Sequence, residues 1–292
     1  DDVESRGLGD VYKRQHMIYG VGNGRKNKII VTFHEQKAKE LYEDYRFFDP
    51  AVVYYPAKDV LFYQSDIRGN LLTAERIQAL RAIHEQDEVT VITTFDALMN
   101  TMAPAKQLWD SICRIAPEDT IDLEHMKDLL VCMGYEKEYQ VESMGQFAIR
   151  GGILDIFPLT EDNPVRIEMW GDEVDTIRSF DVESQKSIEN LDEVVIYPAC
   201  ELVLTEAEKR AGIEKLLKEA ESFSKKLRKE MKTEEAHRAL SQAQELAEEW
   251  GELAVTAGMD AFLSYFCEAK VGLLDYFDPK ETYLFIDELS RS

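Results

Sequence analysis

The stretch KIIVTFHEQKAKELYEDYRFF, residues 28–48, predicts the fold class of the protein. Its first part is a short β-branched run typical of a strand, and the remainder has the composition of a helix. The same kinds of segment recur at 51–56 (AVVYYP, strand), 71–86 (LLTAERIQALRAIHEQ, helix) and 89–94 (VTVITT, strand). Because continuously apolar strands that alternate with helices are typical of parallel sheets covered on both faces, we expect an α/β fold.

The pattern changes after Pro104. Residues 119–135 predict an amphipathic helix, with Thr120 and Asp122 as capping candidates and Gly134 near its end. Short strands separated by turn residues follow at 138–143 (EYQVES), 146–150 (QFAIR), 152–157 (GILDIF), 164–170 (PVRIEMW), 173–180 (EVDTIRSF) and 193–198 (EVVIYP). Such turns favour an antiparallel meander, so this part is predicted to be a small α+β domain inserted into the first.

The last third is predicted to be mainly helical. Residues 205–208 (TEAE) have the spacing of a capping box, and a charged helical stretch runs to about Trp250. A solvated surface helix is the simpler interpretation, and a coiled-coil partner site is the alternative. The predicted organisation is an α/β domain at 16–104, an inserted α+β domain at 105–200, and a helical part with a closing strand at 201–292. Residues 1–15 have no clear period and are excluded as a non-native or disordered lead.

Composition excludes several classes of protein. The formal net charge of −23 repels phosphate backbones, so a free-standing nucleic-acid binder is a poor expectation. The four cysteines contain no CxxC spacing, which argues against a zinc ribbon or a disulfide framework and favours reduced thiols in a cytosolic protein. No apolar run is long enough for a transmembrane helix, and the first residues do not form a signal peptide.

The stretch YLFIDE (283–288) raises the possibility of a nucleotide site, because an apolar strand ending in Asp-Glu is typical of the magnesium-binding half of an ATPase. A P-loop requires GxxxxGK[ST], and no glycine in this chain is followed by lysine. The glycines within 20–26 precede the first strand and have the wrong spacing. No catalytic residues, cofactor or metal ligands are predicted, and Asp287 and Glu288 are interpreted as a relic of an ancestral motor.

The strand 164–170 carries the strongest candidate for a binding surface. Period-two alternation places Val165, Ile167 and Met169 on a core face and Arg166, Glu168 and Trp170 on the opposite, outward face. In QFAIR, Phe147 and Ile149 alternate with Ala148 and Arg150, so Arg150 is predicted to point outward as well. Two interpretations remain open: either Trp170 covers a core edge and the arginines pair with nearby acids, or arginine and tryptophan form a partner site, where both are enriched.

Two motifs carry a resemblance. RGGILDIFP (150–158) and RIEMWGDEVDTIRSFD (166–181) resemble the UvrB-homology module of bacterial transcription-repair coupling factors and, more loosely, the excision-nuclease subunit UvrB. The resemblance covers about residues 17–292. It implies a degenerate P-loop-NTPase-like domain that does not hydrolyse ATP. Two departures from UvrB favour the coupling factors, and the first is that the stretch from Tyr55 to Leu71 is too short for the DNA-clamping hairpin of UvrB. Asp287-Glu288 is followed here by Leu289-Ser290, where UvrB has serine and histidine.

The resemblance also implies partners. The α+β domain is expected to dock UvrA through Arg150, Arg166 and Trp170, with tryptophan standing where the family usually has phenylalanine. The expected function is UvrA recruitment in transcription-coupled excision repair in the bacterial cytoplasm. RNA polymerase, DNA and the ATP-dependent translocase would belong to later domains of a longer parent, whose C-terminal domain can mask the same surface. The alternatives are a UvrB-like damage-loading ATPase and a purely autoinhibitory module.

Overall fold

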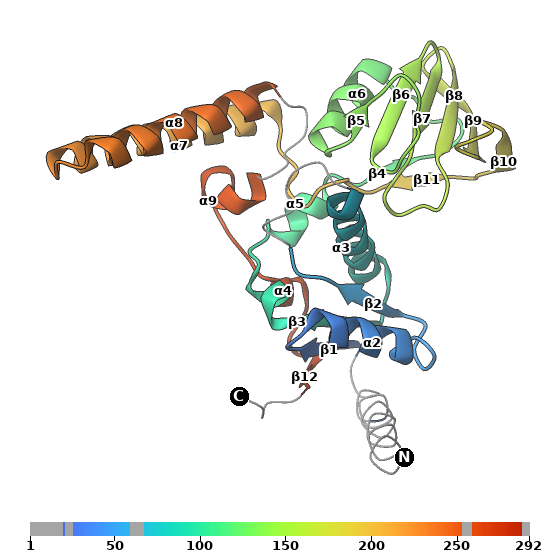
Figure 1. Ribbon diagram of the computed structural model, residues 1–292. Coiled ribbons are helices and arrows are strands. Elements are labelled where there is room, and N and C mark those ends of the chain that lie inside the picture. Colours follow the sequence, from blue (N-terminus) through green and yellow to red (C-terminus); the bar gives the residue numbers. More distant parts are fainter. Residues whose placement is uncertain (1–19, 21–25, 59–66, 253–258, 288–292) are drawn as a thin grey trace. The chain divides into compact units, whose positions relative to one another are not determined.

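The computed structural model describes residue 20 and residues 26–58, 67–252 and 259–287. The chain divides into two compact units (Figure 1). The parallel-sheet unit comprises Asp1–Thr101 and Val271–Ser292, and the inserted unit comprises Met102–Lys270. Within the described residues, no helix is both long enough and apolar enough to span a membrane.

The parallel-sheet unit contains a four-stranded sheet in the order β12-β1-β3-β2, with every neighbouring pair parallel. Its strands are β1 (Asn27–Thr32), β2 (Val52–Tyr55), β3 (Val89–Thr94) and β12 (Thr282–Ile286). Its helices are α2 (Glu35–Tyr45), α3 (Ile67–Glu85), α4 (Phe95–Met99) and the 3-10 helix η3 (Leu273–Tyr276). The strands and helices predicted from residues 28–94 are therefore confirmed, and the sheet is parallel as expected.

The closing strand belongs to this sheet although it lies far along the chain. β12 pairs with β1, with Leu284 beside Ile29 and Ile286 beside Val31. The strands β1 and β3 are buried along almost their whole length, as parallel strands covered by helices must be, and their centres are β-branched. The prediction of a strand at 283–286 is confirmed, and the sheet is completed only after the chain returns from the inserted unit.

The inserted unit contains a six-stranded sheet in the order β10-β9-β8-β7-β6-β5 and a separate pair, β11-β4. The six strands are β5 (Glu136–Lys137), β6 (Gln146–Arg150), β7 (Ile153–Ile156), β8 (Val165–Trp170), β9 (Glu173–Phe180) and β10 (Ser187–Asn190). The separate pair joins β4 (Cys113–Ile115) to β11 (Val194–Ile196). From β6 to β10 the strands are antiparallel, which confirms the meander, whereas β5 and β6 are parallel.

Helix α6 (Leu123–Cys132) covers one face of this sheet, and of the two capping candidates Asp122 is confirmed, whereas Thr120 lies before the helix in a β-bridge with Glu173. The Asp122 carboxylate accepts hydrogen bonds from the first-turn amides of Glu124 and His125, at 2.9 and 3.4 Å. The helix ends before Gly134, whose φ of +86° favours glycine. A Cβ at Gly134 would lie 2.8 Å from the Cys200 sulfur, so glycine is also required there by close packing.

Two of the predicted strands are corrected. Residues 138–143 form no strand, because the Gln146 side chain accepts hydrogen bonds from the backbone amides of Glu142 and Ser143 at 3.0 Å. This side chain replaces the ladder partner that a strand would need. Residues 194–196 do form a strand, but β11 pairs with β4 outside the meander, and β10, which was not predicted, takes the edge of the six-stranded sheet.

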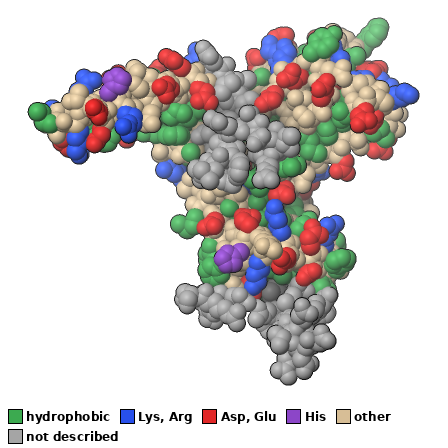
Figure 2. Space-filling view, viewed as in Figure 1, with side chains coloured by type: hydrophobic (Ala, Val, Ile, Leu, Met, Phe, Trp, Pro, Cys, Tyr) green, Lys and Arg blue, Asp and Glu red, His purple; other side chains and the backbone are tan. Residues whose placement is uncertain are grey.

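The charged helical stretch is a hairpin of two helices, α7 (Glu206–Lys229) and α8 (Thr233–Glu252) (Figure 1). The predicted capping box at Thr205 and Glu208 is present. Met231 makes the turn with a φ of +64°. The interpretation as a single solvated helix is wrong, because each helix buries an apolar stripe in a shared cluster that includes Leu216 and Trp250. Figure 2 shows acidic and basic side chains interspersed along the outer surface of this hairpin.

The short helical segments of the inserted unit complete this cluster. They are α5 (Ala105–Trp109), the 3-10 helix η2 (Met259–Phe262) and α9 (Leu263–Phe266). The buried Trp250 ring meets Phe262 and Phe266 edge-on, at centroid distances of 5.3 and 5.6 Å. Gly212 in α7 lets the Phe266 ring approach, since a Cβ there would overlap the ring.

We therefore predict that Gly212→Ala destabilises the protein although alanine is the better helix former. Overpacking against Phe266 should lower the free energy of unfolding by about 1–3 kcal/mol, measured by urea denaturation. The matched control is Gly251→Ala in α8, where no atom of the described residues lies within 4 Å of the added Cβ. The control should raise the free energy of unfolding by up to about 1 kcal/mol. Equal shifts in the two variants would contradict the packing of α9 on α7.

Candidate partner-binding surface

The outer face of the six-stranded sheet carries a row of charged side chains. Strand register places Asp155 of β7 directly opposite Arg166 of β8, and Arg166 directly opposite Arg178 of β9. Residues that face each other across neighbouring strands lie on the same face of a sheet, so all three share one surface. Arg150 of β6 and Glu168 of β8 flank Ile153 in the neighbouring row of the same face.

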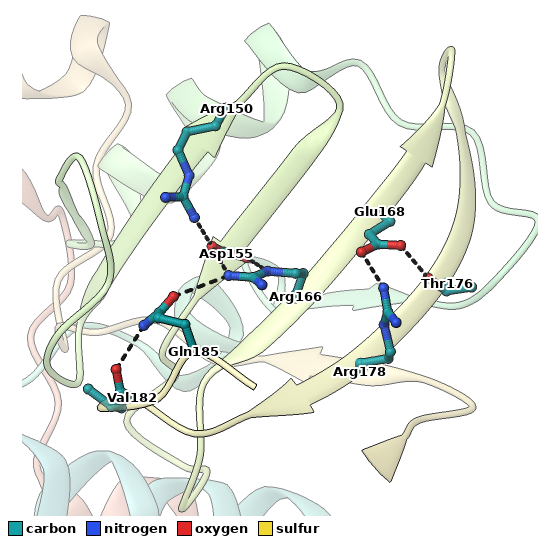
Figure 3. Close-up of polar contacts among 8 residues, drawn as sticks. All are labelled: Arg150, Asp155, Arg166, Glu168, Thr176, Arg178, Val182 and Gln185. Atoms are coloured by element: carbon teal, nitrogen blue, oxygen red, sulfur yellow. Dashed lines mark hydrogen bonds and ion pairs between the residues drawn. The ribbon is translucent and has the colours of Figure 1, made fainter. Parts of the chain in front are cut away.

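Asp155 is the centre of this arrangement (Figure 3). Its side chain is only 1% exposed and binds both neighbouring arginines. Arg166 donates from Nε to Oδ1 at 2.7 Å and from Nη2 to Oδ2 at 2.8 Å, while Arg150 donates from Nη2 to Oδ2 at 2.6 Å. Arg166 thus forms a bidentate pair with the carboxylate, the strongest and most directional geometry for these two groups.

Arg166 is held from two further directions. Its guanidinium lies over the Phe180 ring, 4.5 Å from the ring centroid, and Nη2 donates to the Gln185 side-chain oxygen at 3.2 Å. Gln185 in turn donates to the Val182 carbonyl at 2.8 Å. The hydrogen bonds to Asp155 raise the pKa of Arg166 above its usual value, and burial opposes them. The Arg166 guanidinium therefore stays charged. Its side chain is 18% exposed, so one edge of it remains in solvent.

A second polar group continues the row. Glu168 accepts a hydrogen bond from Arg178 Nη2 at one oxygen and from the Thr176 hydroxyl at the other, the latter at 3.2 Å. The pair Glu168–Arg178 is about one-third exposed on each side. Figure 3 shows this group beside the group centred on Asp155, along the same strands.

Trp170 ends β8 and is 85% exposed. The chain turns immediately afterwards at Gly171, whose φ is +67°, and returns as β9. β6 runs in the same direction as β8 and ends at Arg150, before another turn at Gly151 with a φ of +60°. The ends of β6 and β8 therefore lie at the same end of the sheet, so Arg150 and Trp170 border the same rim.

The structure bears out one part of the first interpretation of Arg150, Arg166 and Trp170, in which they have only structural roles, and not the other part. The arginines do pair with a nearby acid, Asp155, whereas Trp170 covers no core edge because it is almost fully exposed. As partner-binding residues, the three stay a prediction. Asp155 was not singled out from the sequence, although its position between the core residues Leu154 and Ile156 of an apolar strand was a usable signal.

Ala148 lies on the outer face of the sheet, directly opposite Asp155, but it is not exposed there. Ala148 is buried in a small second cluster with Val141, Phe157 and Phe180 on the outer side of the sheet. The loop segments around the strands cover this part of the face, which alternation along a single strand cannot reveal. The polar row therefore begins where this apolar cover ends, next to Phe180.

The candidate nucleotide residues are described only in part. Asp287 follows β12 and forms an ion pair with Lys37 of α2, with 3.1 Å between Oδ2 and Nζ. Glu288, Leu289, Ser290, the glycines within 21–25 and residues 59–66 lie outside the described residues, as does the lead 1–15. In the part of the chain that the structure describes, no group of His, Cys, Asp or Glu could hold a metal ion.

Comparison with known proteins supports the resemblance seen in the motifs. Residues 113–202 match the family model of the UvrB interaction domain, a segment that includes all the strands of the polar row. The chain is 33% identical over 265 residues to the transcription-repair-coupling factor of Bacillus subtilis (strain 168), covering 90% of the chain and 22% of that protein. It is 29% identical over 303 residues to UvrABC system protein B of Thermosipho africanus (strain TCF52B), covering 97% of the chain and 45% of that protein.

A third relative gives the same result. The transcription-repair-coupling factor of Staphylococcus haemolyticus (strain JCSC1435) is 34% identical over 184 residues, 62% of the chain and 16% of that protein. The chain is therefore homologous to both kinds of repair protein. It spans less than half of the length of each of these relatives.

The buried carboxylate generates a prediction about stability. Asp155→Asn should lower the free energy of unfolding by about 3 kcal/mol, because an amide cannot accept from both arginines and leaves them unpaired. The matched control is Asp175→Asn, an exposed carboxylate on β9, which should change the free energy of unfolding by no more than about 0.5 kcal/mol. Urea denaturation measures both. Similar losses in the two variants would show that Asp155 does not organise the face.

Proposed function

We propose that this chain, a homologue of transcription-repair-coupling factors and of UvrABC system protein B, is a non-catalytic UvrB-like module that recruits UvrA in nucleotide excision repair. The observation that carries the proposal is the coincidence of the polar row with residues 113–202, the segment that matches the UvrB interaction domain. Arg150, Arg166 and Trp170 would make the contact.

The chemistry of the surface suits a protein partner. Two arginines are held in fixed positions by Asp155, so little side-chain entropy is lost when a partner binds them. Trp170 offers a large apolar side chain that is free to enter a pocket of the partner. Arginine and tryptophan are among the residue types that contribute most of the binding energy at protein interfaces, and this surface holds both.

The parallel-sheet unit is proposed to be a degenerate P-loop-NTPase-like domain that is split around the inserted unit and needs no cofactor. Its sequence has no phosphate loop, and the Asp287 carboxylate is paired with Lys37. ATP-dependent translocation and contacts with RNA polymerase or DNA would belong to other domains of a longer parent protein. In that parent, a distant C-terminal domain would mask the UvrA surface at rest.

Two alternative functions make different predictions. A UvrB-like damage-loading ATPase would have to bind ATP and hold DNA with this chain, and the net charge of −23 disfavours the latter. A purely autoinhibitory module would use the polar row only within its parent protein. The chain alone and the parent would then both fail to bind UvrA, whereas masking predicts that the chain binds more tightly than the parent.

The first prediction from this proposal concerns Trp170. Trp170→Ala should raise the Kd for purified UvrA about 30-fold or more in a calorimetric titration, because loss of an interface hot spot costs ~2 kcal/mol. The melting temperature should not change, since the exposed side chain contributes little to the core. The matched control is Phe223→Ala on α7, a half-exposed aromatic residue that should leave the Kd unchanged. Equal Kd values for Trp170→Ala and the unaltered chain would reject the proposed surface.

The second prediction concerns nucleotide. Titration with ATP and Mg²⁺ up to about 1 mM should show no saturable binding. The sequence lacks the GxxxxGK[ST] loop, which would position backbone amides and a lysine around the phosphates. Binding in the micromolar range would instead favour the ATPase alternative. Asp287→Asn then serves as the specific control, since loss of that binding in the variant would assign it to the carboxylate that follows β12.

A further inference from the structure

The polar row contains a third arginine, Arg178, which is not among the proposed contact residues Arg150, Arg166 and Trp170. Arg178 lies on β9 directly opposite Arg166, and like charges in directly opposed positions of a sheet destabilise it. We infer that Arg178 is a further partner-binding residue, and that UvrA presents a carboxylate to the Arg166–Arg178 pair. This inference rests on the proposed function and deepens it by assigning the chemistry of the contact.

The charges of the row leave an excess of cations. Asp155 neutralises part of the charge of Arg150 and Arg166, and Glu168 pairs with Arg178. The row thus holds three arginines against two carboxylates on a chain whose formal charge is −23. A net positive patch on a strongly acidic protein selects an acidic partner surface by electrostatic complementarity.

The hydrogen-bond donors of the two arginines support the same conclusion. Arg178 donates from Nη2 to Glu168, while its Nε is buried and has no hydrogen-bond partner among the described residues. Arg166 uses Nε and Nη2 for Asp155 and Gln185. Within the described residues, Nη1 of both arginines therefore makes no hydrogen bond. The exposed part of the two guanidinium groups therefore keeps donors that no described residue uses, and a partner can reach them.

The geometry selects a carboxylate as the acceptor. A guanidinium has a planar fork of donors that matches the two oxygens of a carboxylate, and adjacent guanidinium groups can share one such anion. Arg178 remains 31% exposed and Arg166 18% exposed, so an aspartate or glutamate of the partner can reach both. The acidic balance of the chain disfavours nucleic-acid phosphate as the acceptor.

The test compares the two ends of the Arg178–Glu168 pair in the same calorimetric titration with UvrA. Arg178→Gln should raise the Kd at least ~10-fold, which is the effect of one charge-assisted contact. Glu168→Gln breaks the same ion pair but releases the Arg178 fork, so it should leave the Kd unchanged or lower it. Arg178→Lys should restore part of the affinity. Arg114→Gln on β4, whose arginine pairs at the surface with Glu193, is the control and should bind like the unaltered chain.

Each result bears on the inference. Weakening of equal size in Arg178→Gln and Glu168→Gln would show that the pair only supports the sheet and would overturn it. Unchanged binding by Arg178→Gln, with weakened binding by Trp170→Ala, would overturn it while leaving the proposed function intact. Loss of duplex DNA binding in Arg178→Gln, with UvrA binding retained, would reassign the residue to nucleic acid. No binding of UvrA by the unaltered chain would overturn both the inference and the proposed function.

Discussion

One buried carboxylate organises the surface on which the proposed function depends. Asp155 lies on the third strand from one edge of the sheet, is 1% exposed and accepts hydrogen bonds from Arg150 and Arg166. An unpaired carboxylate in that position would be strongly unfavourable, so both arginines are held against the sheet. The row of charges, the cation over Phe180 and the hydrogen bond to Gln185 follow from this constraint. The arginines are consequently ordered before any partner arrives.

The rim of the same sheet has the opposite character. Trp170 projects from the end of a hairpin, and the turns after Trp170 and Arg150 use glycines with positive φ. A partner would contact the ordered arginines Arg150 and Arg166 beside the exposed side chain of Trp170. The charged arginines would give the contact its specificity, and the tryptophan would supply contact area. The match to the UvrB interaction domain lies within this same unit of the chain, while the homology to repair proteins covers 90% or more of the chain.

Much of this arrangement could be predicted from the sequence, because period-two alternation and turn glycines act locally. Alternation placed Val165 and Ile167 in the core and Arg166 on the other face, as the structure has them. It missed Asp155, since the identity of its cross-strand neighbours depends on register between strands. It also missed the division of the long helical stretch, because the turn at Met231 contains neither glycine nor proline. Tertiary pairing, not local propensity, decides such features.

Hydrogen–deuterium exchange of the chain with and without UvrA tests the central claim most directly. The amides of the two hairpin turns, at Gly151–Gly152 and Gly171–Asp172, lie at the rim beside Arg150 and Trp170. The account predicts that UvrA slows exchange at these turns and along β8 and β9, while exchange in the α7–α8 hairpin and in the parallel-sheet unit stays the same. Protection confined to the α7–α8 hairpin or to the parallel sheet would contradict it.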